Sequence, residues 1–457
     1  MNAKKKSFRG WLLIIPAASI VVALVVLTIV RMEGKPPELT LEMTSPALGR
    51  HPTLAIRVAD AQSGLRKVWV GLVKDGQETV LLEKIFPAAG LLSGGRVREE
   101  NITVDFEPEA EGIKDGKAML RLVVRDYSWR QWGKGNVNYQ EQEVIIDTRP
   151  PAIDVLSRNH YFSQGGAGLV IYKLSEACAT SGVMVGEHLY PGTGGFFKDQ
   201  AIHMALAAVD HRQGPGTDIH VIAVDFAGNQ GRSGLPHLIN ARRFKQDKIN
   251  ISDSFLDWKM PEFVHQVGVA AGSSHLEIFL EVNGALRREN YETLTHVTAR
   301  SDPKMYWEGA FLRLAGAANR AGFADARDYL YDGKVIDHQT HLGVDLASVA
   351  QSPVPAANHG KVVMADALGI YGRTVVIDHG MGLFSMYAHL SHIGVRVGQM
   401  VKMGDTVGKT GRTGLAGGDH LHFSILVHDS FVNPVEWWDE QWVRNNITSK
   451  IKALGQP

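Results

Sequence analysis

The hydrophobic pattern opens with an uninterrupted apolar run, from Trp11 to Val30, that contains no charged residue. An α-helix of about 20 residues covers the roughly 30 Å hydrocarbon core of a bilayer. Basic residues crowd positions 4–9 before the run, whereas both signs of charge are mixed after it. Because cytoplasmic flanks carry the excess of Lys and Arg, we predict a transmembrane helix over residues 11–30 with residues 1–10 in the cytoplasm.

A cleaved signal peptide is the competing interpretation of this run. The apolar core of such peptides spans about 7–15 residues and precedes a small-x-small cleavage site. Here the run is longer, and Val30-Arg31-Met32-Glu33 offers no such site. We therefore expect an uncleaved, single-pass anchor in the inner membrane, with the remainder of the chain in the periplasm.

Two β-rich segments follow the apolar run. Apolar residues alternate with polar ones in short stretches such as Leu54 to Val58 and Ile102 to Phe106, which is the period of half-buried strands. Thr148-Arg149-Pro150-Pro151 interrupts the pattern, because two prolines remove hydrogen-bond donors and favour an extended linker. We expect two β-sandwich domains of the immunoglobulin-like type, over residues 31–148 and 149–243.

The periodicity becomes helical in the next segment, residues 244–324. Ser274-x-x-Glu277 has the form of a capping box, and Leu276, Phe279 and Leu280 follow at the spacing of one helix face. A partly helical connector is expected here. It either packs on its neighbours, as most helices do, or acts as a gate over a substrate groove.

Composition narrows the possible partners. Lys plus Arg and Asp plus Glu both number 48, so the formal net charge is zero and no global attraction to polyanions is expected. We therefore expect no nucleic-acid partner. Cys178 is the one cysteine, which excludes an intramolecular disulfide. At 457 residues the chain is long enough for several domains, each with its own core.

Short strands separated by glycine turns dominate residues 325–440, followed by a tail over residues 441–457. This pattern predicts a compact antiparallel β-core. Side chains of one strand repeat every two residues, so His420 and His422 can reach the same small volume. The fold class is thus mainly β, with helices expected in the membrane segment, in the connector and near the end of the chain, where Trp437, Trp438 and Trp442 suggest a helix packed by aromatic side chains.

The same segment carries residue types suited to a catalytic zinc, which takes three His or carboxylate ligands and leaves one position for water. Candidate ligands are His341, Asp345 and one member of the His420/His422 pair; the other member and His389 then serve as bases or transition-state donors. His338, three residues before His341, is the alternative ligand if this register is wrong.

Several spaced motifs resemble those of the lysostaphin and LytM type zinc endopeptidases, which cut peptide cross-links in bacterial peptidoglycan. The motifs are His341-x-x-x-Asp345, Pro353-Val354 with Gly360-x-Val362, Tyr387-x-His389, Val401-x-x-Gly404-Asp405, Thr410-Gly411-x-Thr413-Gly414 and His420-x-His422-Phe423. The resemblance is confined to residues 325–440. Asp419 departs from it, since relatives often have a small residue or proline there.

The resemblance implies that His341, Asp345 and His422 hold one Zn²⁺ per chain, and that His389 and His420 are the catalytic pair. It implies a peptidoglycan peptide as substrate. Two alternatives stay open: a catalytically silent LytM-like regulator that activates another hydrolase, and an envelope scaffold that binds other envelope proteins through its β-domains.

Overall fold

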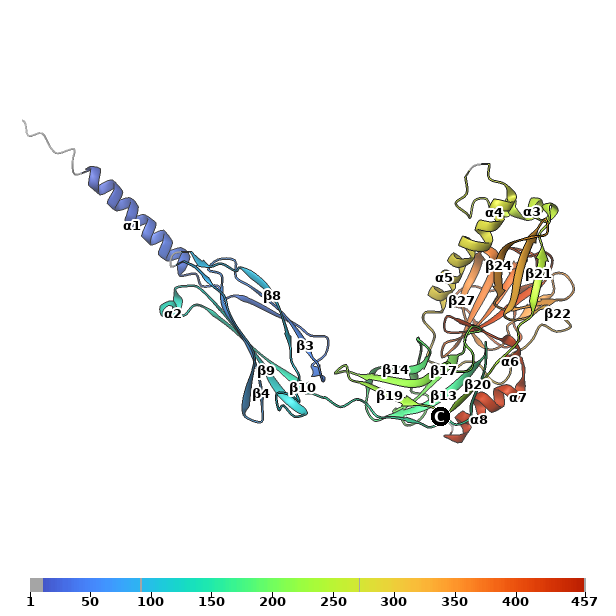
Figure 1. Cartoon of the computed structure of the whole chain (residues 1–457), viewed down its shortest axis with the longest axis horizontal. Helices are drawn as coiled ribbons and strands as arrows, with labels where there is room; N and C mark the ends of the chain where they lie inside the picture. The colour runs from blue at the N-terminus through green and yellow to red at the C-terminus, as the bar shows by residue number, and fades with distance from the viewer. Residues whose placement is uncertain (1–10, 91–92, 271, 456–457) are drawn as a thin grey trace, which may run out of the picture. The chain divides into compact units, whose positions relative to one another are not determined.

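The computed structural model describes residues 11–90, 93–270 and 272–455, so the predicted cytoplasmic tail, residues 1–10, lies outside the described residues. The chain divides into two compact units. The first runs to Pro150 and includes residues 224–230, and the second comprises residues 151–223 and 231–457. The chain is mainly β, as the sequence predicts (Figure 1).

The predicted N-terminal apolar helix is present as α1 (Trp11–Arg31). Its segment Ile14–Arg31 has a mean hydropathy of 2.5 and is almost wholly exposed. Its length and composition suit a membrane span, and its side chains have no core of their own to pack against. Its role as an anchor in the cell remains a prediction.

The first unit continues as a β-sandwich of a three-stranded sheet, in the order β1-β3-β8, and a five-stranded sheet, in the order β2-β10-β9-β4-β5. Its elements are β1 (Glu38–Glu42), β2 (Ala47–Leu48), β3 (Thr53–Ala59), β4 (Leu65–Lys74), β5 (Gln77–Ile85), β6 (Ala88–Gly90), β7 (Gly94–Gly95), β8 (Glu99–Asp105), β9 (Gly116–Asp126), α2 (Arg130–Gly133) and β10 (Val137–Ile146).

Alternation of burial along these strands produces the sandwich. Leu54, Ile56 and Val58 of β3 are buried while their neighbours are not, and every second residue of β9 is buried. Because successive side chains of a strand point to opposite faces, each sheet has one apolar face, and the two faces close on a shared core.

The second unit begins with another set of β-sheets, in the orders β11-β13-β17-β16, β15-β14-β18-β19 and β12-β20. Their strands are β11 (Ile153–Val155), β12 (His160–Ser163), β13 (Ala167–Leu174), β14 (Cys178–Val185), β15 (His188–Pro191), β16 (Thr193–Gly194), β17 (Ile202–Ala208), β18 (Ile219–Asp225), β19 (Gln230–Gly234) and β20 (His237–Asn240).

The segment predicted as a connector is partly helical. It contains β21 (Gln246–Asn250), α3 (Asp253–Lys259), the 3₁₀ turn η1 (Met260–Glu262), α4 (His275–Glu281), the π-helical turn η2 (Val282–Leu286) and α5 (Arg287–Thr298). The capping box at the start of α4 is confirmed: Ser274 Oγ accepts the Glu277 N–H, and the Glu277 carboxylate accepts the Ser274 N–H. The strand β21 was not predicted.

The histidine-rich segment folds around a large sheet in the order β22-β25-β33-β29-β28-β27-β31, with β34 beside β33. Two three-stranded sheets, β21-β23-β24 and β26-β32-β30, flank it. The strands are β22 (Ala318–Ala321), β23 (Asp325–Tyr331), β24 (Lys334–His341), β25 (Val344–Ala347), β26 (Pro353–Pro355), β27 (Gly360–Leu368), β28 (Gly372–Gly380), β29 (Leu383–Leu390), β30 (His392–Ile393), β31 (Met400–Val401), β32 (Thr406–Lys409), β33 (Leu421–Val427) and β34 (Ser430–Val432), with the 3₁₀ turn η3 (Gly369–Tyr371).

The described chain ends in short helices that pack against both sets of sheets of the second unit. They are α6 (Pro434–Trp438), α7 (Glu440–Val443), the π-helical turn η4 (Arg444–Thr448) and α8 (Ser449–Ala453). The buried Glu436 accepts the Ala167 N–H at 3.3 Å, and Lys450 Nζ donates to the Leu169 carbonyl at 2.9 Å. These contacts join the helices to β13, so one hydrophobic core continues through the unit.

Candidate metal centre and active site

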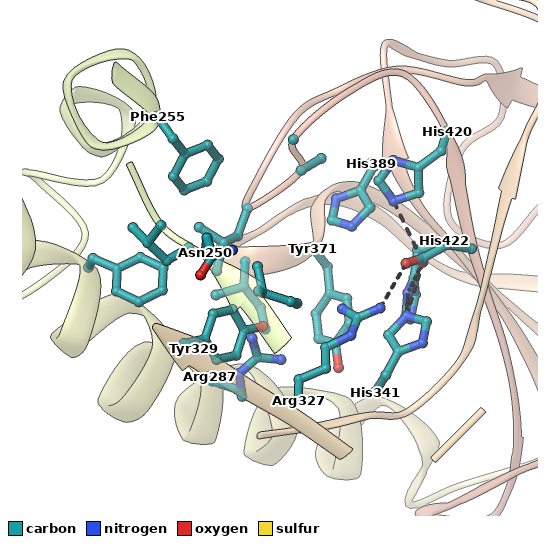
Figure 2. A pocket seen from close by; sticks show the side chains of 18 residues that line it. Asn250, Phe255, Arg287, Arg327, Tyr329, His341, Tyr371, His389, His420 and His422 are labelled. Carbon is teal, nitrogen blue, oxygen red and sulfur yellow. Dashed lines mark hydrogen bonds and ion pairs between the residues drawn. The ribbon is translucent and has the colours of Figure 1, made fainter. Parts of the chain in front are cut away.

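Three side chains from neighbouring strands converge on one point. His341 ends β24, while Asp345 of β25 and His422 of β33 are direct cross-strand partners. The three facing atoms, His341 Nε2, Asp345 Oδ1 and His422 Nδ1, are each 3.0 Å from the other two (Figure 2). The antiparallel register of β25 and β33 thus brings together residues 77 positions apart.

Hydrogen bonds on the far side of each ring fix which nitrogens carry protons. His341 Nδ1 lies 2.7 Å from the Gly322 carbonyl, which can only accept, so Nδ1 donates and Nε2 is bare. The Ser424 hydroxyl donates to the Leu342 carbonyl, so it accepts from His422 Nε2–H at 3.0 Å and leaves His422 Nδ1 bare. In their neutral forms, both rings therefore present a bare nitrogen to Asp345 Oδ1.

Such a triangle of acceptors is suited to a cation. Two imidazole nitrogens and a carboxylate oxygen are the donor set of catalytic zinc sites, where the second ring nitrogen commonly donates to a carbonyl or similar acceptor. Each of the three residues offers one ligand atom within 4.8 Å of the others. His341 and His422 are only 5% exposed. The residues present therefore fit one Zn²⁺.

His389 and His420 lie beside this triangle. Their rings are 4.8 Å apart, and His420 Nε2 is 3.6 Å from Asp345 Oδ1. His389 Nδ1 donates to the Thr413 carbonyl at 2.8 Å and His420 Nδ1 to the Gly418 carbonyl at 2.9 Å, so both present Nε2 towards the site. His389 also has a φ of 60°, a left-handed conformation that is uncommon outside glycine and recurs at functional sites.

Burial and neighbouring charges shift the pKa values of these groups in different directions. Burial, reinforced by His420 and His422, holds the pKa of His389 well below its usual range. Burial also lowers the pKa of His422 to about 4. For His420, burial is outweighed by the Asp345 carboxylate, which raises its pKa. Asp345 has the opposite balance, since the surrounding histidines overcome burial and hold its pKa well below normal. One neutral and one more basic imidazole thus stand side by side.

Two further side chains hold the site and were not identified from the sequence. Arg327 of β23 donates from Nη2 to Asp345 Oδ2 at 3.1 Å, on the side away from the triangle. The Tyr371 ring lies 5.6 Å from that of His422. The alternating pattern of β23 shows only that Arg327 lies on a strand. Its nearness to Asp345 follows from the pairing of β23 with β24, which no local signal reveals.

Gly343 is also required, because a Cβ there would lie 2.5 Å from His422 Nε2. Asp419, where the sequence departs from the family pattern, accepts the Thr410 hydroxyl at 2.6 Å and the Gln351 N–H at 3.2 Å. It thereby fastens the turn that presents His420.

The alternative ligand is excluded by its position. The His338 side chain is 74% exposed and its Nδ1 lies 2.8 Å from Asp328 Oδ1, away from the triangle.

The site opens into a cavity of about 310 Å³. The labelled histidines lie on one side of it and Phe255, from the partly helical segment, lies on the other (Figure 2). Asp345 and Phe279 also line the cavity. Arg287 and Arg327 place two guanidinium groups in the lining. The helical segment therefore shapes the groove as well as packing on the core.

Clustered histidines and a carboxylate on an antiparallel sheet form a candidate metal centre. Residues 339–434 match the model of peptidase family M23. The chain thus contains a peptidase family M23 domain, and the resemblance noted in its motifs is confirmed.

Named relatives agree with this family. The chain is 34% identical over 116 residues to the peptidoglycan DD-endopeptidase ShyB of Vibrio cholerae, covering 25% of this chain and 26% of that protein. It is 38% identical over 96 residues to the peptidoglycan DD-endopeptidase ShyA of the same organism, covering 21% of this chain and 22% of that protein. The similarity therefore spans about a quarter of each relative.

Among solved structures, the catalytic domain of lysostaphin from Staphylococcus simulans is 27% identical, with a TM-score of 0.25 over 29% of this chain and 98% of that one.

Proposed function

We propose that this protein is a zinc-dependent endopeptidase that hydrolyses peptide cross-links of bacterial peptidoglycan, anchored in the inner membrane by α1 with its peptidase domain in the periplasm. The observation that carries the proposal is the triangle of three bare acceptor atoms on His341, Asp345 and His422, with two further imidazoles at its edge. The names of the relatives ShyA and ShyB, peptidoglycan DD-endopeptidases, support the choice of substrate.

Within this proposal the chain's own residues divide the work. Zinc supplies a Lewis acid that polarises a carbonyl and acidifies a water. His389 is neutral, and its bare Nε2 can accept a proton from that water. His420 Nε2 faces the same position, 3.6 Å from Asp345 Oδ1, and as an N–H it can donate to an oxyanion. Arg327 holds Asp345 in place through the oxygen that faces away from the triangle.

The groove also suits the charge of the proposed substrate. Peptidoglycan stem peptides carry free carboxylates, and a guanidinium recognises a carboxylate through paired hydrogen bonds. Arg287 lines the cavity, and its Nε and Nη2 donate to the Asn283 carbonyl at 3.2 Å and to Asn283 Oδ1 at 2.5 Å, which orients the guanidinium and leaves Nη1 available to a substrate carboxylate. We assign it to the binding of a substrate carboxylate.

The test is digestion of purified peptidoglycan by the full chain in detergent, followed by mass analysis of the fragments. Expected products are stem peptides released by cleavage of a peptide bond within the cross-link, formed on the order of 10²-fold more slowly with His420→Ala. His338→Ala, an exposed histidine outside the site, is the matched control and should digest normally. Zinc binding without any digestion would favour the silent regulator. The absence of both zinc binding and digestion would favour the scaffold.

A further inference from the structure

A second cluster of acidic side chains lies in the first unit, far along the sequence from the peptidase site. Glu33 follows α1 by two residues, Asp60 lies in the turn between β3 and β4, and Asp126 ends β9. Each contributes one carboxylate oxygen, and these oxygens lie within 4.8 Å of one another. The three residues are 7%, 6% and 0% exposed, respectively.

Most of the oxygens in the cluster are held by hydrogen bonds that orient them. Asp60 Oδ1 accepts the N–H groups of Gln62, Ser63 and Gly64 at 2.9, 2.9 and 3.0 Å. Asp126 Oδ1 accepts the N–H of Asn136 at 2.7 Å, and its Oδ2 accepts Asn136 Nδ2 at 2.8 Å. Two carboxylates are thus fixed in place.

Glu33 supplies the independent observation. Its Oε1 accepts the Ser63 hydroxyl at 2.7 Å, whereas its Oε2 is buried and has no hydrogen-bond partner. A buried carboxylate oxygen without a partner is costly, and two like charges beside it add to the cost. Among the described residues, no Lys, Arg or His forms an ion pair with Glu33, Asp60 or Asp126.

The two basic residues that flank Glu33 in the sequence, Arg31 and Lys35, bond to other groups, and the buried Arg31 Nε has no hydrogen-bond partner. Arg31 Nη2 donates to the Tyr127 carbonyl at 2.6 Å, and its guanidinium lies 5.7 Å from the centre of the Trp129 ring. Lys35 pairs with Glu38 at 2.6 Å. Burial, together with Asp60 and Asp126, raises the pKa of Glu33, so a proton is the competing occupant.

We propose that Glu33, Asp60 and Asp126 form a binding site for Ca²⁺. The donor set is all oxygen, which suits a hard cation, and Ca²⁺ tolerates irregular geometry where Mg²⁺ demands an octahedron. A cavity of about 120 Å³, lined by Glu33 and Asp60, adjoins the carboxylates and has room for coordinating waters. The ion fastens the residue that follows α1 to two loops of the sandwich, and so stiffens the joint between the apolar helix and the first β-domain.

The experiment measures Ca²⁺ bound to the metal-stripped full chain in detergent, by equilibrium dialysis at about 10⁻⁵ to 10⁻² M Ca²⁺, which brackets the affinities of extracellular modules. The wild type should bind one Ca²⁺ per chain more than Glu33→Gln. Asp60→Asn, which retains the Oδ1 acceptor of the turn, should show the same loss. Glu109→Gln, an exposed acid of the same unit, is the matched control and should bind like the wild type.

Thermal unfolding gives a second measurement, because the effect of Glu33→Gln on the melting temperature should differ with and without Ca²⁺. Without Ca²⁺, Glu33→Gln should melt no lower than the wild type, because one of three repelling charges is gone. With Ca²⁺, only the wild type and Glu109→Gln should rise in melting temperature. The proposal would be overturned if wild type and both site variants bound equal amounts of Ca²⁺. It would also be overturned if the site took up a proton but no Ca²⁺. Neither outcome bears on the zinc site.

Discussion

At the scale of single residues, the decisive feature is the arrangement of protons. The acceptors behind His341 and His422 force both rings to present bare nitrogens to Asp345. The sequence supplied the residue types and their spacing, which sufficed to select all five site residues as candidates. The residue types and spacing alone left His420 and His422 open as the ligand, because that choice depends on ring orientation and on the hydroxyl of Ser424, and only the family resemblance selected His422.

The division of roles leads to a prediction for His389 and His420. Neither is part of the acceptor triangle, so His389→Ala and His420→Ala should each keep about one zinc per chain. Each should lose on the order of 10²-fold in turnover, the scale of general acid–base catalysis. Zinc content by atomic absorption, beside the digestion rate, checks both. Loss of zinc from either variant would show that the roles are wrongly assigned.

A second prediction concerns the charge of the groove. Arg287→Gln should raise KM for a cross-linked peptide with free carboxylates by about tenfold, which corresponds to roughly 1.4 kcal/mol for a charged hydrogen bond. The matched substrate is the same peptide with its carboxylates amidated, for which wild type and variant should have similar KM. Equal effects on both peptides would contradict the assignment of Arg287.

At the scale of elements, strand pairing brings the site together. Alternation and glycine turns allowed most strands of the core to be predicted, together with the helix begun by Ser274. The pairing of β25 with β33, and of β23 with β24, could not be read from the sequence, since these partners are set by long-range packing. For the same reason β21 was missed, and the position of the helical segment beside the groove was only one of two alternatives.

The central strand β28 carries a prediction for pH dependence. His379 is fully buried between the His359 carbonyl and Ser385 Oγ, each at 2.7 Å, and burial lowers its pKa to about 4. The unfolded chain, with an ordinary histidine pKa of about 6.5, binds the proton more readily. Stability is therefore present above pH 6.5 and declines as the pH falls towards 4, by up to about 1.4 kcal/mol per pH unit for this group.

His379→Gln should flatten that decline, because the amide does not titrate. The measurement is the free energy of unfolding in urea between pH 7 and pH 4, with His338→Gln as the exposed control. Other buried histidines also make the free energy of unfolding depend on pH, so some dependence remains in every variant. The same dependence on pH in wild type and in His379→Gln would contradict the account.

At the scale of the whole molecule, an apolar helix, two sets of β-sheets and an M23 domain share one chain. The broad fold was predictable because apolar and polar residues alternate along strands such as β3 and β9 and because the apolar run is long. The packing of the second set of sheets on the M23 domain was not predictable, since single contacts such as Glu436 with Ala167 leave no periodic signal.

The helix α1 leads to a prediction of topology. A reporter that is active only in the periplasm, fused after Pro457, should be active, and the chain should remain in the membrane fraction after a high-salt wash. Replacing Val22 and Val26 with Arg should release it, because each buried charge costs about 2.5–3.5 kcal/mol at the centre of a membrane helix. Activity of a reporter that works only in the cytoplasm would contradict the orientation.

The most direct test of the central claim is the rate of peptidoglycan digestion measured against zinc returned to the metal-stripped protein. We predict no digestion without metal, a linear rise, and a plateau at one zinc per chain, with no rise for His422→Ala. Digestion that persists after complete removal of zinc, or that stays absent at full loading of the wild type, would contradict the account.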